Sequence, residues 1–201
     1  MRFIINRWTY LLSNLDSRLH GKQTCYCINS VSCSNCWQKT KLDSLQNLID
    51  FNTLDAIICP VNQSNNHWFV LVAFVYSKTV MVYDSFSHKS DFVFPKQQIQ
   101  HFQKYLKKGF KSDYNNNEWK TKVGGNIPTQ HDSICCGVYT CLICEHIVHY
   151  GGVGDSKRID LNFQKYTYDD SDMVFFRLRM LTFMRDQSWK LISLFNTVHI
   201  F

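Results

Sequence analysis

The distribution of apolar residues along the chain predicts a sheet in its first half. Residues 67–76 are almost wholly apolar, which is typical of a strand that is buried on both faces and is therefore central in its sheet. Thr79–Tyr83 follows after a tight connection and predicts a second strand that pairs back on the first. Residues 55–61 predict a short buried strand that Pro60 and the following polar run stop, and residues 119–123 are a further candidate strand.

Five other segments are predicted to be helices. The apolar residues indicate four of them, at residues 1–20, 42–49, 97–110 and 136–148. The last starts at Asp169, where the acidic run 169–172 suits an N-cap and first turn. The fourth is the most apolar, because eight of the eleven residues 138–148 are apolar, and it predicts a helix deep in the core that Gly151 and Gly152 end. Helices and strands in this order predict an α+β fold.

Composition narrows the class of protein. The chain has 201 residues, 45% of them apolar and 15% aromatic, which suits one domain with a core and excludes a disordered chain. The longest apolar run, residues 68–76, is shorter than the roughly 18 residues that a membrane-spanning helix needs. Asn6 and Arg7 interrupt the apolar start of the chain, so we expect no signal peptide, no membrane partner and a location in the nucleus or cytoplasm.

The charge distribution does not favour a nucleic-acid partner. Twenty-two Lys+Arg against 16 Asp+Glu give a formal net charge of +6, and the basic residues are scattered apart from one denser run at 104–111. Such runs are most often solvated helix faces, and no stripe of aromatic residues accompanies this one in the sequence. We therefore expect a monomer that does not bind nucleic acid.

The nine cysteines are an odd number without an export signal, so reduced thiols are expected. The first four leave two interpretations open, because they could be zinc ligands or ordinary thiols. Their spacing, C-x-C-x5-C-x2-C, matches no common zinc site well and favours ordinary thiols; the four are Cys25, Cys27, Cys33 and Cys36. Cys141 and Cys144 lie in the apolar helical segment, where small core residues are expected rather than a redox pair.

Three polar residues stand at the ends of predicted elements, where reactive groups can meet. His67 opens the central strand and Asp84 follows the next strand, so the antiparallel pairing makes them neighbours. A carboxylate in that position can orient an imidazole. Cys136 opens the buried helix, and a helix N-terminus and a nearby imidazolium both favour the thiolate form of a cysteine. This pattern predicts a nucleophile with its base.

Two further residues complete this set. Gly137 lets another chain come close to the sulfur, and Gln130, six residues before Cys136, carries an amide that can donate to an oxyanion together with the first N–H groups of the helix. Taken singly, each of these residue types is more often structural: a histidine beside tryptophan, an aspartate that ends a strand, a buried cysteine before glycine. Their joint occurrence at fixed element ends favours the catalytic interpretation.

Two segments, HWFVLVAFVYSKTVMVYDS and PTQHDSICCGVYTC, resemble the ubiquitin-like-protein-specific cysteine proteases, which include the SUMO-deconjugating enzymes and adenovirus-protease-like enzymes. The pattern of that family is His-Trp opening a strand, Asp-Ser closing the next, and then Gln, five residues and Cys-Gly. The matching positions are His67, Trp68, Asp84, Ser85, Gln130, Cys136 and Gly137. The similarity covers roughly residues 40–185.

The resemblance implies a papain-like cysteine protease fold with a central mixed sheet and a buried helix that carries the nucleophile. It implies a cysteine peptidase or isopeptidase, without a cofactor, that cleaves after Gly-Gly of a ubiquitin-like modifier such as SUMO. His67 would be the general base, Asp84 its orienting partner, Cys136 the nucleophile and Gln130 the oxyanion donor. Trp68 and Gly137 would bind the substrate. Trp68 is expected at the exposed mouth of its strand, as the roof of a narrow channel for the glycines.

The chain departs from the family pattern at two points. Cys135 precedes the nucleophile, where the family usually has Asp or Asn, and the opening motif of Trp followed by Leu-Asn-Asp is absent. We therefore expect one globular domain in which residues 1–40 are a diverged or truncated N-terminal region and residues 41–201 the catalytic part. Two alternatives stay open: a non-catalytic module that binds a modifier, and a peptidase or acetyltransferase of the same fold that serves a virus, a mobile element or a pathogen.

Overall fold

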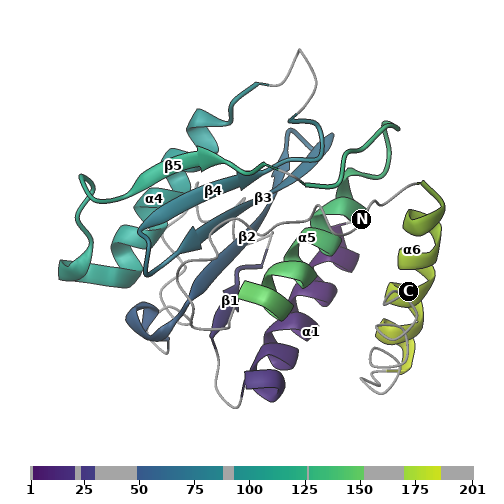
Figure 1. Cartoon of the computed structure of the whole chain (residues 1–201), viewed down its shortest axis with the longest axis horizontal. Coiled ribbons are helices and arrows are strands. Elements are labelled where there is room, and N and C mark those ends of the chain that lie inside the picture. Colours follow the sequence, from purple (N-terminus) through teal and green to yellow (C-terminus); the bar gives the residue numbers. More distant parts are fainter. Residues whose placement is uncertain are drawn as a thin grey trace.

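A five-stranded mixed sheet forms the centre of the molecule (Figure 1). The computed structural model describes residues 2–20, 24–29, 49–87, 93–125, 127–151 and 170–186. The strands lie in the order of the sequence: β1 (Cys25–Cys27), β2 (Ala56–Gln63), β3 (His67–Phe74), β4 (Thr79–Tyr83) and β5 (Lys120–Val123). β2, β3 and β4 pair antiparallel, whereas β1 runs parallel to β2 and β5 runs parallel to β4. The mixed sheet, and β3 as its central strand, are confirmed.

One strand is longer than predicted. β2 continues through Pro60 to Gln63, so the prediction that Pro60 stops the strand was wrong. β1 pairs only with residues 56–58 of β2. Beyond Ile58 the outer side of β2 is therefore an edge of the sheet within the described residues, and an edge tolerates a residue that lacks an N–H.

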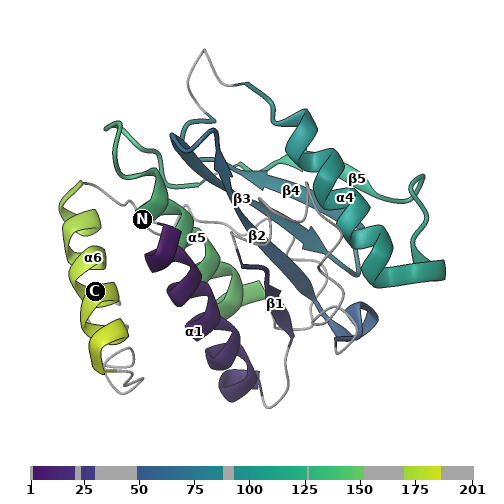
Figure 2. The same ribbon diagram turned by 180° about the vertical axis from the view of Figure 1, so that it is seen from behind.

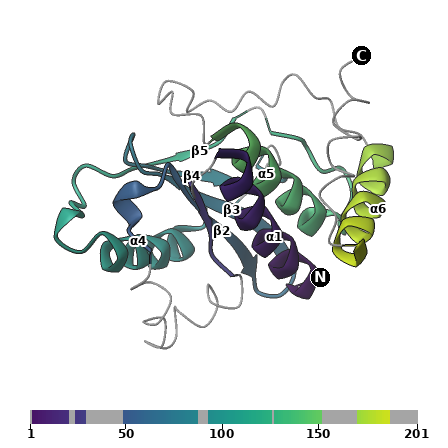
Figure 3. The same ribbon diagram turned by 90° about the horizontal axis from the view of Figure 1, so that it is seen from below.

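Helices cover both faces of the sheet (Figures 2 and 3). α4 (Lys96–Phe110) packs on one face, with the one-turn helices η1 (Phe51–Thr53) and η2 (Lys111–Asp113) beside it. α5 (Cys136–Gly151) and α1 (Arg2–His20) cover the other face, and α6 (Asp170–Asp186) lies on their outer side. These bounds agree with four of the five predicted helices, while residues 42–48 of the remaining segment lie outside the described residues.

Alternate residues of β3 point to the two layers of helices. Trp68, Val70 and Val72 belong to the core on the α5 side, and Phe69 and Leu71 belong to the core on the α4 side. This arrangement explains the continuous apolar run, since both faces of β3 are buried.

The described part of the N-terminal segment belongs to the same core and sheet. β1 is a strand of the sheet, and α1 buries the apolar face that its sequence predicts. Trp8 of α1 is fully buried, and its Nε1 donates a hydrogen bond to the Cys141 carbonyl oxygen of α5 at 3.2 Å. Its indole also meets Phe176 and Phe183 of α6 edge to face, with centroids 5.8 and 5.5 Å away. Trp8 therefore joins α1 to both neighbouring helices.

A buried ion pair connects α5 to α6. The Glu145 carboxylate of α5 accepts a hydrogen bond from the Arg179 guanidinium of α6, and Nε2 of His149 lies 3.9 Å from the other carboxylate oxygen. Burial raises the pKa of Glu145, and the charge of Arg179 opposes that effect. The one acidic residue of the most apolar helix is therefore paired with a cation in the interior.

The cysteines that the structure describes are all free thiols. Cys141 and Cys144 are buried in the core, as predicted, and burial raises the pKa of both thiols. Two of the four residues weighed as zinc ligands, Cys33 and Cys36, lie outside the described residues, so that interpretation stays open. Among the described residues, no group of three or more His, Cys, Asp or Glu side chains is placed to hold a metal ion.

The helices that the structure describes include none with the length and apolar character to cross a membrane.

We expect Trp8→Ala to lower the free energy of unfolding by about 3–5 kcal/mol, as other large-to-small changes in a core do. The matched control is Phe3→Ala on the same helix, because Phe3 is 82% exposed and changes at exposed positions stay within about 0.5 kcal/mol. Urea denaturation of the two variants measures both values. Equal losses would contradict the anchoring role of Trp8.

Candidate active site

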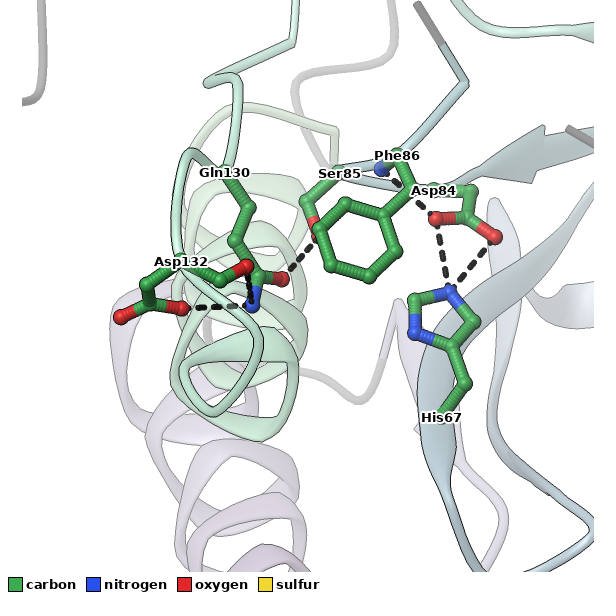
Figure 4. Close-up of polar contacts among 6 residues, drawn as sticks. All are labelled: His67, Asp84, Ser85, Phe86, Gln130 and Asp132. Carbon is green, nitrogen blue, oxygen red and sulfur yellow. Dashed lines mark hydrogen bonds and ion pairs between the residues drawn. The ribbon is translucent and has the colours of Figure 1, made fainter. Parts of the chain in front are cut away.

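His67 and Asp84 meet at the open end of the β3–β4 hairpin. The register pairs Val70 with Tyr83, so Asp84 follows β4 at the end of the sheet where β3 begins. Nε2 of His67 lies 2.8 Å from both carboxylate oxygens of Asp84 (Figure 4). Asp84 is buried and His67 is partly exposed. The structure therefore brings together the two residues that the sequence predicted as neighbours.

The surroundings of His67 favour its charged form. Burial by itself lowers the pKa of the imidazole, but the hydrogen bond to Asp84, the interaction with Cys136 and the negative charges of both groups raise it to about 9. Nδ1 is buried and makes no hydrogen bond of ordinary geometry with any described residue. Cys136 is nevertheless close enough to act on the ring, which fits a catalytic contact that tightens when substrate binds.

The two adjacent thiols have different partners. Cys136 is the buried first residue of α5 and interacts with His67. Cys135 instead accepts a hydrogen bond from Nη2 of Arg177 in α6 at 2.9 Å, and its backbone N–H donates to Oδ1 of Asp132 at 2.8 Å. This divergence favours Cys136 over Cys135 as the nucleophile, and that assignment stays a prediction.

Gln130 is fully buried and all of its amide groups are bonded (Figure 4). Nε2 donates to the backbone oxygen of Asp132 at 3.0 Å and to its Oδ1 at 2.7 Å, and Oε1 accepts from the Ser85 hydroxyl at 2.9 Å. Asp132 offers acceptors to both amide protons, which fixes the orientation of the amide. In this conformation neither proton is available to an oxyanion, so Gln130 could act as that donor only after its amide leaves Asp132.

Asp132 organises the loop before α5. Its Oδ1 accepts the backbone N–H groups of Ile134 and Cys135 as well as the Gln130 amide. Burial raises the pKa of this carboxyl, but hydrogen bonds from Cys135, Gln130 and Ile134 outweigh it and lower the pKa to about 2. Asp132 is therefore ionised at neutral pH and holds the loop from which α5 starts.

Trp68 is not exposed as expected. Its side chain is 5% exposed and belongs to the apolar cluster that also contains Cys136 and Tyr139. The prediction of an exposed position was wrong because Trp68 points to the face of β3 that packs on α5 and is part of the core there. Gly137, the second residue of α5, is also buried. The substrate-binding roles of Trp68 and Gly137 stay predictions.

Four residues of the site were given no role from the sequence. Ser85, Phe86, Asp132 and Arg177 contact the predicted residues or their neighbours. Asp132 carries a signal that could have been used, because an aspartate in a turn commonly accepts the backbone N–H two residues later, as it does here from Ile134. Phe86 and Arg177 come together with their partners only in the folded chain.

The chain matches the model of one protein family and is similar to several solved structures. Residues 9–186 match the model of the Ulp1 protease family, C-terminal catalytic domain. No curated protein matches the chain. Among solved structures, the chain is similar to the C-terminal Ulp1 protease domain in complex with Smt3, the yeast ortholog of SUMO. That match has 17% identity and a TM-score of 0.64, and it covers 92% of this chain and 75% of the other.

Two other structures extend the comparison. The catalytic domain of the Ulp1-like SUMO protease from Chaetomium thermophilum is 17% identical with a TM-score of 0.69, over 88% of this chain and 68% of the other. The Xanthomonas campestris effector XopD bound to ubiquitin is 21% identical with a TM-score of 0.58, over 90% of this chain and 89% of the other. At these identities the structures share the fold with this chain. Since the family model also spans most of the sequence, the chain belongs to the Ulp1 protease family of cysteine proteases.

Proposed function

We propose that the chain is a cysteine peptidase or isopeptidase that cleaves after the C-terminal Gly-Gly of a ubiquitin-like modifier. The observation that carries this proposal is the His67 imidazole, which Asp84 holds through Nε2 and which also interacts with Cys136. A base oriented by a carboxylate, beside a cysteine at a helix N-terminus, is the arrangement that activates a thiol.

In the proposed reaction each group has its own step. The Cys136 thiolate attacks the carbonyl carbon of the terminal glycine, and the carbonyl oxygen becomes an oxyanion. The N–H groups of Val138 and Tyr139 donate to the Cys135 carbonyl oxygen, so those of Cys136 and Gly137, which open α5, are the candidates to donate to that oxyanion. His67 holds its transferable proton on Nδ1, because Asp84 occupies Nε2. It gives that proton to the leaving amine and then accepts one from the water that hydrolyses the thioester, which regenerates Cys136.

The proposal also names a class of substrate. The similar structures include one domain in complex with Smt3 and one bound to ubiquitin, so a ubiquitin-like partner is the class of substrate we propose. Hydrolysis by a free thiolate suits a reducing compartment, and the nucleus or cytoplasm is the location we propose.

A second candidate function is a non-catalytic module that binds a modifier. The observation that favours it is the Gln130 amide, whose protons are both held by Asp132. A module of this kind would bind the modifier without forming a covalent intermediate, which separates the two functions experimentally.

The test is a panel of ubiquitin-like modifiers that carry a C-terminal electrophile, which a catalytic thiolate captures covalently. We expect wild type and Cys135→Ser to form an adduct with at least one modifier, and Cys136→Ser to form none. Cys135→Ser is the matched control because a hydroxyl can also accept the Arg177 hydrogen bond. Intact-protein mass spectrometry measures the adduct. Attachment at Cys135 would overturn the assignment of the nucleophile, and binding without an adduct in wild type would favour the module.

We expect His67 and Asp84 to act as one unit. His67→Ala should lower kcat/KM by about three orders of magnitude or more, since the thiol loses its base, and Asp84→Ala should cost less. The double variant should be no slower than His67→Ala, because residues that act together are not additive. Steady-state kinetics on the modifier that reacts in the adduct assay measures all three. Losses that multiply would show that Asp84 acts independently of His67.

A further inference from the structure

Phe86 contacts both members of the His67–Asp84 pair. Its ring stacks on the imidazole of His67, with centroids 4.9 Å apart and planes inclined by 9° (Figure 4). Its backbone N–H donates to Oδ1 of Asp84 at 2.8 Å, the same oxygen that lies 2.8 Å from Nε2 of His67. A second ring, Phe69, lies farther from the imidazole, at 6.3 Å and 22°.

We propose that Phe86 is a positioning residue for the reaction, which holds the plane of the His67 ring and stabilises its protonated form. This inference rests on the proposed function, because it assigns to Phe86 a role in preparing His67 for Cys136. It adds a residue that the sequence motifs did not contain.

Two physical effects support this role. The imidazole can rotate about its bond to Cβ, and a ring stacked flat against it restricts that rotation, so the direction of Nδ1 is held. The face of an aromatic ring also carries negative electrostatic potential and attracts a cation placed over it. Phe86 is half-buried and therefore also shields the contact between His67 and Asp84 from water on that side.

The sign of the effect on protonation follows from the contacts of His67. The titratable groups that act on it are Asp84 at the end of β4 and Cys136 at the start of α5, and both raise the pKa of the imidazole against the effect of burial. An aromatic face acts in the same direction. Replacement of the ring by an aliphatic side chain of similar size keeps the burial of the imidazole and removes only the aromatic face. It should therefore lower the pKa of His67 from about 9 and move the alkaline limb of the pH–rate profile to lower pH.

A purely structural role makes a different prediction. If Phe86 only filled space at the end of β4, an aliphatic side chain of similar size would preserve the pKa of His67, and any loss of activity would follow a loss of stability. The pKa of the imidazole therefore separates positioning from packing.

The experiment compares Phe86→Leu and Phe86→Met, which remove the ring, with Phe86→Tyr, which keeps it. Phe175→Leu on α6 is the matched control for loss of a partly exposed phenylalanine, because Phe175 is 40% exposed and lies outside the hairpin that carries His67 and Asp84. The pKa of His67 is measured by NMR titration of the imidazole. In parallel, kcat and KM are measured between pH 6 and pH 10 on the modifier captured in the adduct assay, and melting temperatures are recorded.

We expect Phe86→Leu and Phe86→Met to lower kcat roughly tenfold, as misplacement of a catalytic group does, with little change in KM. Their alkaline limbs should move to lower pH with the pKa of His67, while Phe86→Tyr and Phe175→Leu should resemble wild type. An unchanged pKa in both aliphatic variants would overturn the inference, whether or not their stability falls. If wild type shows no activity, the proposed function fails, whereas the NMR titration still decides whether Phe86 stabilises the imidazolium.

Discussion

Burial of α5 by the sheet, by α1 beside it and by α6 on its outer side (Figure 3) is the constraint on which the rest of the structure depends. The helix packs apolar side chains against all three, and so it cannot slide or rotate without exposing part of the core. Its first residue, Cys136, is therefore placed relative to the sheet by packing along the whole helix. The hairpin places His67 and Asp84 relative to the same sheet, and the two halves of the site meet where both are rigid.

Polar contacts fix the details that apolar packing leaves open. Glu145 and Arg179 join α5 to α6 inside the core, and Arg177, two residues earlier on α6, bonds to the Cys135 thiol. The same helix therefore supports the middle of α5 and the residue before its first turn. The Cys135 side chain accepts this hydrogen bond through its sulfur.

The sequence predicted those features that a local period or a topology rule determines. The two-sided burial of β3 is visible as a continuous apolar run, and antiparallel pairing alone makes His67 and Asp84 neighbours. Pro60 was misread because a residue pattern does not show where a strand becomes the edge of a sheet. The burial of Trp68 depends on which face of β3 the helix covers, and the bonds of Gln130 depend on the side-chain position of Asp132. Contacts of this kind arise in tertiary structure and leave no period in the sequence.

Asp84 and Ser85 are consecutive residues that bind different partners in the site. Asp84 holds the imidazole, whereas the Ser85 hydroxyl and carbonyl hold the side chain and backbone of Gln130. Side chains alternate along an extended chain, so a slip of one residue in the pairing of β3 with β4 would turn each of these two residues toward the other's partner. Both contacts would then be lost. An inserted residue in the turn at 75–78 can bulge outward and spare the pairing, but one within β4 cannot. The stretch from the start of β4 to Asp84 and Ser85 therefore tolerates substitutions far better than insertions or deletions.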